Sequence, residues 1–240
     1  MNQFRPTSFD VLPAIIKNLL IINGLMFLAQ NTIAGPTSAF SFEDVFALHA
    51  FQSDLFRPWQ LITHMFLHGD LGHIFGNMLA LWMFGSILEN IWGEKQFLAF
   101  YFLCGIGAAL IHLAATSYDL MGATKIYNQL VSSGIAQSGE ALEFMARYKA
   151  RVDVATLGAS GAVFGILIAF VYLFPNTYIY IYFFIPMKAK WLGILYFSYE
   201  LFFALKNSAG DGVARWAHVG GALVGFVLVY IWKKRNRRFY

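Results

Sequence analysis

The sequence contains few charged residues and a single cysteine. Asp, Glu, Lys and Arg make up 12% of its 240 residues, against roughly 25% in ordinary soluble domains. Because 58% of the residues are hydrophobic, the chain lacks the polar surface that a water-soluble globule of this size needs. The composition therefore predicts a membrane protein with several spans. Cys104 has no second cysteine to pair with, so cysteine usage does not indicate a redox compartment.

Two further absences bear on the organisation of the chain. Residues 1–10 are polar and the first apolar run has no small-residue cleavage site, so no cleavable signal peptide is predicted. No repeat and no low-complexity tract divides the sequence. We therefore expect one membrane domain over residues 1–240.

Six apolar segments are long enough to be predicted as membrane spans. In lipid every backbone polar group must be satisfied internally, so all six are expected to be helices in an all-α, polytopic bundle. Two long outer loops, 34–73 and 116–156, would join them, and the second has helix-like patterning around Gly139–Tyr148. A shorter aromatic stretch, Tyr178–Met187, is expected to be an interfacial connection. The predicted spans are 13–33, 74–92, 97–115, 157–174, 190–206 and 213–232.

Basic residues are concentrated on one side of the predicted bundle. With six spans, both chain ends lie on that side, which the positive-inside rule predicts to be cytoplasmic. A nucleic-acid-binding tail is the alternative use of the C-terminal bases, but a membrane-flanking cluster is favoured and no nucleic-acid partner is expected. The C-terminal bases are Lys233, Lys234, Arg235, Arg237 and Arg238.

Unusual polar residues lie at the start of alternate spans. The second, fourth and sixth spans run in the same direction, so their first turns lie at one depth. His73 and Asn77 are on the second, Ser160 on the fourth and His218 on the sixth. A polar side chain buried in a membrane bundle is costly and is a functional candidate by default.

Glycines beside the serine and the histidine predict close helix packing. Gly161 and Gly165 are four residues apart, as are Gly221 and Gly225, and small residues at this spacing let membrane helices approach closely. The helix faces best suited to packing are therefore those that carry Ser160 and His218. The alternative is that these are ordinary packing glycines and that the serine bonds back to a carbonyl.

A serine and a histidine that meet inside the membrane indicate nucleophilic catalysis. Ser160 would be the nucleophile and neutral His218 the general base, and later the acid for the leaving amine. No carboxylate is obviously placed to orient the histidine, because Asp211 is near only in sequence, so a dyad is the simpler hypothesis. Phe164, one turn below Ser160, either packs against the imidazole or is an ordinary core or lipid-facing residue.

Donors for a tetrahedral oxyanion are also present. His73 and Asn77 share a helix face, and the backbone N–H of Ser160 is a third donor. His64 and His68 are spaced four apart and offer a metal site as an alternative. Without a His-Glu-x-x-His motif or a nearby Cys, we expect them to tie the first loop together by hydrogen bonds, and we expect no metal and no cofactor.

The positions of carboxylates within the predicted spans indicate whether other intramembrane chemistries are possible. An aspartyl mechanism needs two membrane aspartates, and no predicted span has an Asp in its middle. Glu89 is expected to cap or bridge helices at the end of the second span. Glu200, midway along the fifth, has no assigned partner and keeps a transporter hypothesis open.

At this point the sequence resembles the rhomboid intramembrane serine proteases. Three motifs occur in the family's order over nearly the whole predicted core, and together they are highly specific. They are Gly158-Ala159-Ser160-Gly161, Ala217-His218-Val219-Gly220-Gly221-Ala222-Leu223-Val224-Gly225, and His64-x3-His68-x4-His73-x3-Asn77.

The resemblance implies hydrolysis of peptide bonds in or near the transmembrane segment of single-span membrane proteins, inside the lipid bilayer. It implies a Ser160–His218 dyad, an oxyanion hole of Asn77, His73 and the Ser160 amide, and an aromatic contact from Phe164. The fifth span, with its aromatic run Tyr196–Phe203, and the loop 207–212 would form a lateral gate and cap.

The sequence also departs from the family pattern. Trp59 is followed by Gln60 where many relatives have Trp-Arg, which would weaken a polar tie in the first loop. The short form and the charge layout suggest a bacterial inner (plasma) membrane, with the active site open to the outer face. A catalytically silent rhomboid-like protein that binds membrane clients is the alternative function. The sequence does not indicate the oligomeric state.

Overall fold

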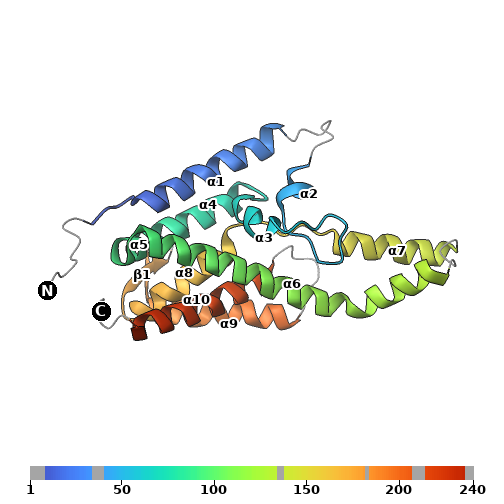
Figure 1. Cartoon of the computed structure of the whole chain (residues 1–240). Helices are drawn as coiled ribbons and strands as arrows, with labels where there is room; N and C mark the ends of the chain where they lie inside the picture. Colours follow the sequence, from blue (N-terminus) through green and yellow to red (C-terminus); the bar gives the residue numbers. More distant parts are fainter. Residues whose placement is uncertain (1–8, 34–40, 134–137, 182–183, 207–213, 236–240) are drawn as a thin grey trace.

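Helices dominate the molecule and lie side by side in one bundle, from which a helical arm projects at one end (Figure 1). The computed structural model describes residues 9–33, 41–133, 138–181, 184–206 and 214–235. The bundle helices are α1 (Ala14–Ile33), α6 (Glu94–Ser133), α8 (Ser160–Leu173), α9 (Ala189–Lys206), α10 (Arg215–Arg235) and one continuous segment made of α4 (Leu71–Ala80), the π-helical turn η2 (Leu81–Gly85) and α5 (Ser86–Trp92).

Four of the described helices are long and apolar enough to cross a membrane. They are Ala14–Ile33, Leu71–Trp92, Glu94–Ser133 and the segment Arg215–Lys234 of α10. The expectation of six such helices is met only in part. The 14 residues of α8 rise about 21 Å, less than the roughly 30 Å of a hydrocarbon core. Helix α9 contains three charged residues, Lys190, Glu200 and Lys206, in its 18 positions.

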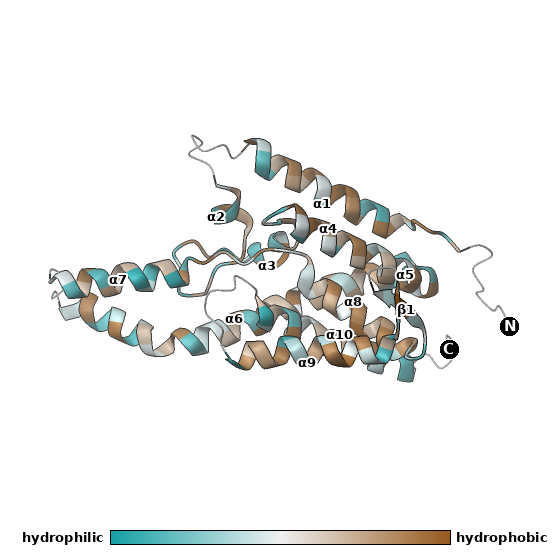
Figure 2. Cartoon of the chain, turned by 180° about the vertical axis from the view of Figure 1, so that it is seen from behind, coloured by the Kyte–Doolittle hydropathy of each residue, from teal (hydrophilic) through white to brown (hydrophobic). Residues whose placement is uncertain are grey.

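The short helix α8 occupies the centre of the bundle. Nine of its residues are buried, and it contacts α6, α9, α10 and the α4–η2 segment. Apolar residues predominate along the bundle helices, whereas polar residues are interspersed along α7 (Gly139–Val152) in the arm (Figure 2). A central helix surrounded by others can carry polar groups that lipid would exclude.

The N-terminal end of α1 and the C-terminal end of α10 lie at the same end of the bundle, opposite the arm (Figure 1). There the carboxylate of Glu89 accepts hydrogen bonds from the amides of Ile15 and Ile16, each 2.9 Å long. These amides belong to the first turn of α1 and have no partner within the helix. The expectation that Glu89 caps a helix is thereby confirmed.

The arm replaces most of the loop that the sequence predicted over residues 116–156. Helix α6 continues to Ser133 and α7 returns beside it. The rings of Tyr127 and Tyr148 stack with centroids 4.5 Å apart, and the Thr124 hydroxyl lies 3.0 Å from the Tyr148 hydroxyl. The helix-like pattern around Gly139–Tyr148 is confirmed by α7, and the helix of the third predicted span continues past residue 115 to Ser133.

A small antiparallel hairpin adds a β element to the otherwise helical fold. Strands β1 (Tyr178–Ile181) and β2 (Ile185–Lys188) pair with Tyr178 opposite Lys188. They connect α8 to α9, where the sequence predicted an interfacial connection. The all-α expectation is corrected to this extent, because alternating β-branched and aromatic residues favour a strand.

The first loop folds around the buried side chain of Gln60. This loop contains α2 (Phe42–Phe46), α3 (Gln60–Thr63) and the 3-10 turn η1 (His64–Phe66). The Gln60 amide donates to the carbonyls of Leu55 at 2.9 Å and Asp44 at 3.2 Å, while its oxygen accepts from the Arg57 amide at 3.1 Å. Gln60 therefore supplies polar ties of its own to this loop.

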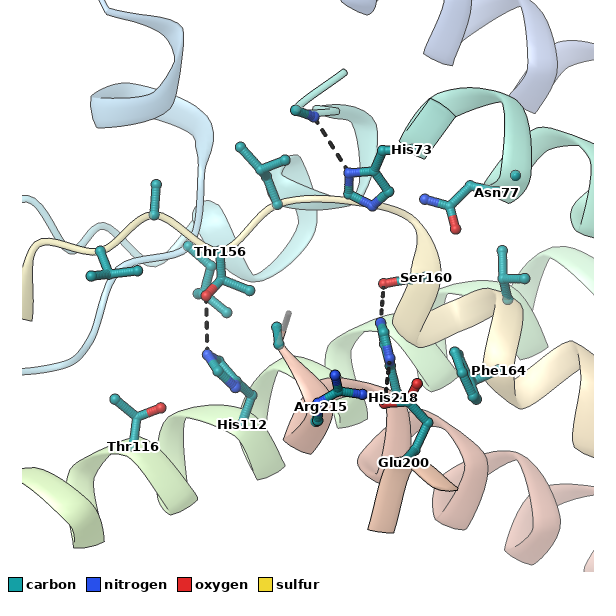
Figure 3. A pocket seen from close by; sticks show the side chains of 18 of the residues that line it. His73, Asn77, His112, Thr116, Thr156, Ser160, Phe164, Glu200, Arg215 and His218 are labelled. Carbon is teal, nitrogen blue, oxygen red and sulfur yellow. Dashed lines mark hydrogen bonds and ion pairs between the residues drawn. The ribbon is translucent and has the colours of Figure 1, made fainter. Parts of the chain in front are cut away.

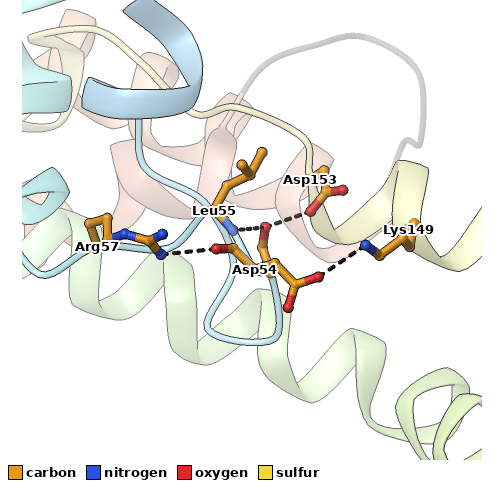
Figure 4. A network of polar contacts seen from close by, with 6 residues as sticks. Asp54, Leu55, Arg57, Lys149 and Asp153 are labelled. Carbon is orange, nitrogen blue, oxygen red and sulfur yellow. Dashed lines mark hydrogen bonds and ion pairs between the residues drawn. The ribbon is translucent and has the colours of Figure 1, made fainter. Parts of the chain in front are cut away.

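Polar contacts also fasten the first loop to the base of the arm (Figure 4). Lys149 lies 3.0 Å from the Asp54 carboxylate, and the hydroxyl of Ser53 donates to Asp153. Arg57 donates to the backbone carbonyl of Asp54 at 2.9 Å. Loop and arm base thus form one surface at this end of the bundle.

Candidate active site

The approach to Ser160 is an extended segment bound to the first loop. Leu48 and Thr156 exchange two backbone hydrogen bonds of 2.8 Å, and the Gly158 amide donates to the His64 carbonyl at 2.9 Å. The chain then turns at Gly158, whose φ is +122°, a conformation that side chains disfavour. Helix α8 begins at Ser160, not at residue 157 as the sequence predicted, so its amide lies in a first turn without intrahelical partners.

Ser160 and His218 are in hydrogen-bond contact. The Oγ atom of Ser160 lies 2.9 Å from Nε2 of His218, which is in the first turn of α10. The Phe164 ring stacks on the imidazole, with centroids 4.4 Å apart and planes inclined by 12°. This stacking restricts ring rotation, so the histidine presents one edge to the serine (Figure 3).

Glycines allow the two helices to come this close. A Cβ added to Gly221 would collide with the carbonyl oxygen of Gly161, and one added to Gly225 would lie 2.6 Å from the Cα of Gly165. Backbone is in contact with backbone here, so no side chain could be accommodated without separating α8 from α10. The glycine pairs on the serine and histidine helices therefore face each other.

Asn77 and His73 lie on the other side of Ser160, on α4 (Figure 3). A Cβ on Gly158 would lie 2.7 Å from Nε2 of His73 and 3.6 Å from Nδ2 of Asn77. The Gly69 amide donates to Nδ1 of His73 at 3.4 Å, which leaves Nε2 as the protonated nitrogen. Among the described residues the buried Nδ2 of Asn77 has no hydrogen-bond partner. Two donors thus converge beside the serine.

Glu200 was not assigned a partner from the sequence, but it contacts the histidine. Its Oε2 lies 3.0 Å from Nδ1 of His218 and 3.4 Å from a guanidinium nitrogen of Arg215. The signal that could have found it is a lone carboxylate in an apolar helix, with an arginine three residues before the histidine on the next helix. Asp211, the alternative weighed from the sequence, lies outside the described residues, as does the loop 207–212.

His64 and His68 are buried beneath the site in the first loop. Nδ1 of His64 donates to the Gln60 carbonyl at 2.7 Å, and burial lowers the pKa of this histidine to about 4. The His68 ring has no hydrogen bond among the described residues and contacts the His73 ring edge to face, with centroids 5.1 Å apart. Burial and the neighbouring His73 lower the pKa of His68 to about 4 as well.

No metal-binding cluster of three His, Cys, Asp or Glu residues occurs in the part of the chain that the structure describes. His64 and His68 instead serve the loop, the first through its ring and the second through its backbone. The His68 amide donates to the side-chain oxygen of Gln30 in α1, at 3.0 Å.

A cavity of about 1170 Å³ contains the Ser160–His218 pair. His73, Asn77 and Glu200 also line it, and it extends along α6 past His112 and Thr116 to the ion pair of Asp119 and Arg151 at the base of the arm. The cavity is therefore continuous from Ser160 to the base of the arm, between the first loop and α6. An activated hydroxyl, converging N–H donors and access for water are the requirements of acyl transfer to water.

Residues 56–235 match the family model described as the Rhomboid domain. The chain belongs to the rhomboid family. Similar rhomboid proteins include RHOMBOID-like protein 12, mitochondrial, of Arabidopsis thaliana, which is 30% identical over 184 residues covering 76% of this chain and 49% of that protein. Rhomboid protein 1, mitochondrial, of Saccharomyces cerevisiae is 29% identical, covering 74% of this chain and 44% of its own.

A bacterial relative matches over more of its length. Rhomboid protease AarA of Providencia stuartii is 26% identical over 226 residues, which are 90% of this chain and 71% of that protein. The chain spans about half the length of the mitochondrial relatives that it matches.

These relatives correct the expected location in a bacterial plasma membrane. The plant and yeast rhomboids above are mitochondrial by name, as are relatives from Schizosaccharomyces pombe and Bos taurus. They point to a mitochondrial membrane instead. The expected placement of the termini in the cytoplasm and of the site at the outer face assumed a bacterial plasma membrane, so it is wrong together with that assumption. The physical reason is that basic flanks set the orientation of helices in a membrane and carry no information about the organelle.

Proposed function

We propose that this rhomboid is an active intramembrane serine endopeptidase that cleaves single-span membrane proteins in or near their transmembrane segment. The observation that carries the proposal is the 2.9 Å contact between the Ser160 hydroxyl and Nε2 of His218. A serine hydroxyl is a weak nucleophile until a neighbouring base accepts its proton, and the histidine is positioned to do so.

In the first half of the reaction, Oγ of Ser160 attacks the scissile carbonyl carbon while its proton passes to Nε2 of His218. The oxyanion that forms accepts hydrogen bonds from Nδ2 of Asn77, from Nε2 of His73 and from the Ser160 amide. The imidazolium then gives its proton to the leaving amine, the C–N bond breaks and an acyl-serine remains.

The second half hydrolyses the acyl-serine. A water molecule in the cavity, which Thr116 and Asp119 also line, loses a proton to His218 and attacks the ester carbonyl. Collapse of this intermediate returns the proton to Oγ of Ser160 and releases the new carboxyl end. The partly enclosed cavity strengthens the hydrogen bonds to the oxyanion, because few water molecules compete for the donors.

The alternative is a catalytically silent rhomboid that binds membrane clients. The serine and histidine of this chain are both present and in contact, which favours the enzyme. A transporter hypothesis rested on Glu200 alone, and the contacts of Glu200 with His218 and Arg215 account for that carboxylate without an ion path.

A fluorophosphonate probe and a cleavage assay test the proposal together. The purified protein is labelled in detergent and is also reconstituted in liposomes with a panel of single-span substrates. We expect labelling and cleavage by the wild type and neither by Ser160→Ala or His218→Ala. Ser86→Ala is the control, because it makes the same serine-to-alanine change at a buried position of α5, away from the site. A folded wild type that neither labels nor cleaves would favour the silent client-binding protein.

A further inference from the structure

Glu200 is a buried carboxylate in an unusual place. It lies in α9 with 3% of its surface exposed, on a helix whose neighbouring side chains, among them Tyr196, Tyr199 and Phe202, are largely apolar and exposed. Burying an ionised carboxylate without partners is strongly unfavourable, so such a group is retained only where hydrogen bonds and opposite charge satisfy it.

The partners of Glu200 are two residues of α10, the histidine of the site and an arginine. Oε2 lies 3.0 Å from Nδ1 of His218 and 3.4 Å from Arg215. Arg215 precedes His218 by three residues, so both project from one face of α10 toward α9. The Arg215 guanidinium lies over the rings of Tyr199 and Phe203, 5.3 and 4.9 Å from their centroids, which fixes its position.

The geometry defines which nitrogen of His218 carries the proton. A carboxylate only accepts hydrogen bonds, so Nδ1 must be the donor toward Glu200. The neutral imidazole then has its lone pair on Nε2, facing Ser160 Oγ at 2.9 Å. Figure 3 shows the order of the three groups, with the imidazole between the serine and the glutamate. When the imidazole takes the serine proton, the adjacent carboxylate stabilises the positive charge.

We propose that Glu200 is a positioning residue for His218 and converts the expected dyad into a Ser160–His218–Glu200 relay, with Arg215 holding the carboxylate in place. This inference rests on the proposed function. Glu200 does not touch the substrate or Ser160, and it acts through the histidine by fixing the tautomer and the ring edge. Because it belongs to α9, the relay is complete only while α9 lies against α10.

The test compares Glu200→Gln with a matched buried carboxylate. Glu89→Gln removes the same charge from a residue that is 2% exposed but caps α1, away from the cavity. In liposomes with a cleaved single-span substrate, we expect Glu200→Gln to lower kcat between about 10²- and 10⁴-fold with KM within about threefold. Glu89→Gln is expected to lower the unfolding temperature and leave kcat unchanged.

A spectroscopic readout separates positioning from a general structural role. In protein labelled with ¹⁵N-histidine, the His218 signals are assigned by their absence in His218→Ala. We expect the wild type to show the Nδ1-protonated tautomer and Glu200→Gln to show a mixture with the Nε2-protonated form. A wild-type kcat or an unchanged tautomer in Glu200→Gln would overturn the proposal. Faster cleavage would overturn it as well, because it would mean that Glu200 limits the movement of α9.

Removing one charge can destabilise the protein by leaving the other buried. The double variant Glu200→Gln/Arg215→Gln removes both and keeps the test decisive if the single variant does not fold. Persistent loss of kcat in the double variant supports positioning by Glu200. Wild-type activity would mean that the carboxylate only neutralises Arg215, and the proposal would fail. In each of these experiments, the wild type and Ser160→Ala are assayed as well. Cleavage by the wild type and its loss in Ser160→Ala test the proposed function separately.

Discussion

At the scale of single residues, Asn77 has the most narrowly defined contribution. Its Nδ2 is buried without a partner among the described residues and lies beside Ser160 (Figure 3). An unsatisfied buried donor costs free energy, and the cost is offset if the donor is used by the oxyanion of the reaction. We expect Asn77→Ala to lower kcat on the order of 10²–10³-fold, as the loss of one oxyanion donor does.

The control for Asn77→Ala is Asn23→Ala. Asn23 is buried as well, but its side-chain amide donates to the Leu19 carbonyl within α1. That variant should unfold at a lower temperature while its kcat stays at the wild-type value. The measurement is kcat in the liposome assay beside thermal unfolding. A wild-type kcat in Asn77→Ala would assign this asparagine to packing.

Residue spacing was informative where a helix carries its own signal. Ser160, His218 and the paired glycines could be recognised because each lies at a fixed offset on one helix. The sequence marks Glu200 only as a lone carboxylate and does not give its role, because His218 lies 18 positions further along the chain and the rotation of α9 about its axis decides whether Glu200 faces the site. That rotation follows from tertiary packing, which the sequence pattern of an almost uniformly apolar helix does not indicate.

At the scale of elements, the contact between α8 and α10 decides whether the site forms. Gly221 has no room for a Cβ against the Gly161 carbonyl, so Gly221→Ala must push the two helices apart. We expect a lower unfolding temperature and loss of at least about tenfold in kcat, since an ångström of misplacement is enough to impair proton transfer.

Gly24→Ala is the matched control for this contact. It makes the same change in the interior of α1, where nothing lies within 4 Å of the added Cβ. Alanine is the better helix former, so the control should be neutral or slightly stabilising. Equal unfolding temperatures and rates in the two variants would show that the α8–α10 glycine contact does not govern the site.

The stability of the first loop is expected to depend on pH through His64. The pKa of His64 is about 4 in the folded protein and close to 6.5 when the loop is unfolded. Between these values the unfolded loop binds more protons, so stability is complete above about pH 6.5 and falls as the pH drops toward 4. At pH 5 the loss from this one histidine is about 2 kcal/mol.

Thermal unfolding in detergent at pH 7.5 and pH 5 measures this effect. The wild type should unfold at a lower temperature at pH 5, and His64→Gln should show a smaller difference between the two pH values, because the titrating ring is gone. An equal pH difference in both proteins would mean that other groups carry the dependence.

Element boundaries show where hydropathy misleads. The predicted fourth span began at residue 157 because Ala155, Leu157 and Ala159 continue the apolar run, but the positive φ of Gly158 keeps this segment extended. The predicted third span ended at residue 115, where polar residues begin to alternate with apolar ones. Helix α6 continues because α7 covers it, burying Leu120, Tyr148 and Val152 together.

At the scale of the whole molecule, the arm extends well beyond the membrane thickness. The 40 residues of α6 rise about 60 Å, twice the roughly 30 Å of a hydrocarbon core. Among the described residues, the base of the arm contacts the remainder of the protein through the cluster of Leu120 with Ala50 and the polar ties of Figure 4. We therefore expect the site to depend on the base of the arm and not on its distal half.

This division predicts the effect of shortening the arm. Replacing residues 129–146 by a short Gly-Ser linker retains the stacked pair of Tyr127 and Tyr148, whose rings are 4.5 Å apart, together with the Asp54–Lys149 and Asp119–Arg151 contacts. We expect labelling of Ser160 by the fluorophosphonate probe to stay within about twofold of the wild type, because the contacts of Ser160, His218 and Glu200 with the rest of the described chain do not involve the removed residues.

Asp153→Ala is the opposite perturbation, because it leaves the arm at full length and removes the side chain that accepts from Ser53 at the base. That change loosens the first loop, and with it the segment 154–159 that leads into Ser160, so labelling should slow and the unfolding temperature should fall. If the shortened arm loses labelling while Asp153→Ala keeps it, the distal arm and not its base supports the site. Labelling that is retained with cleavage lost in the shortened protein would instead assign the distal arm to binding the substrate outside the membrane.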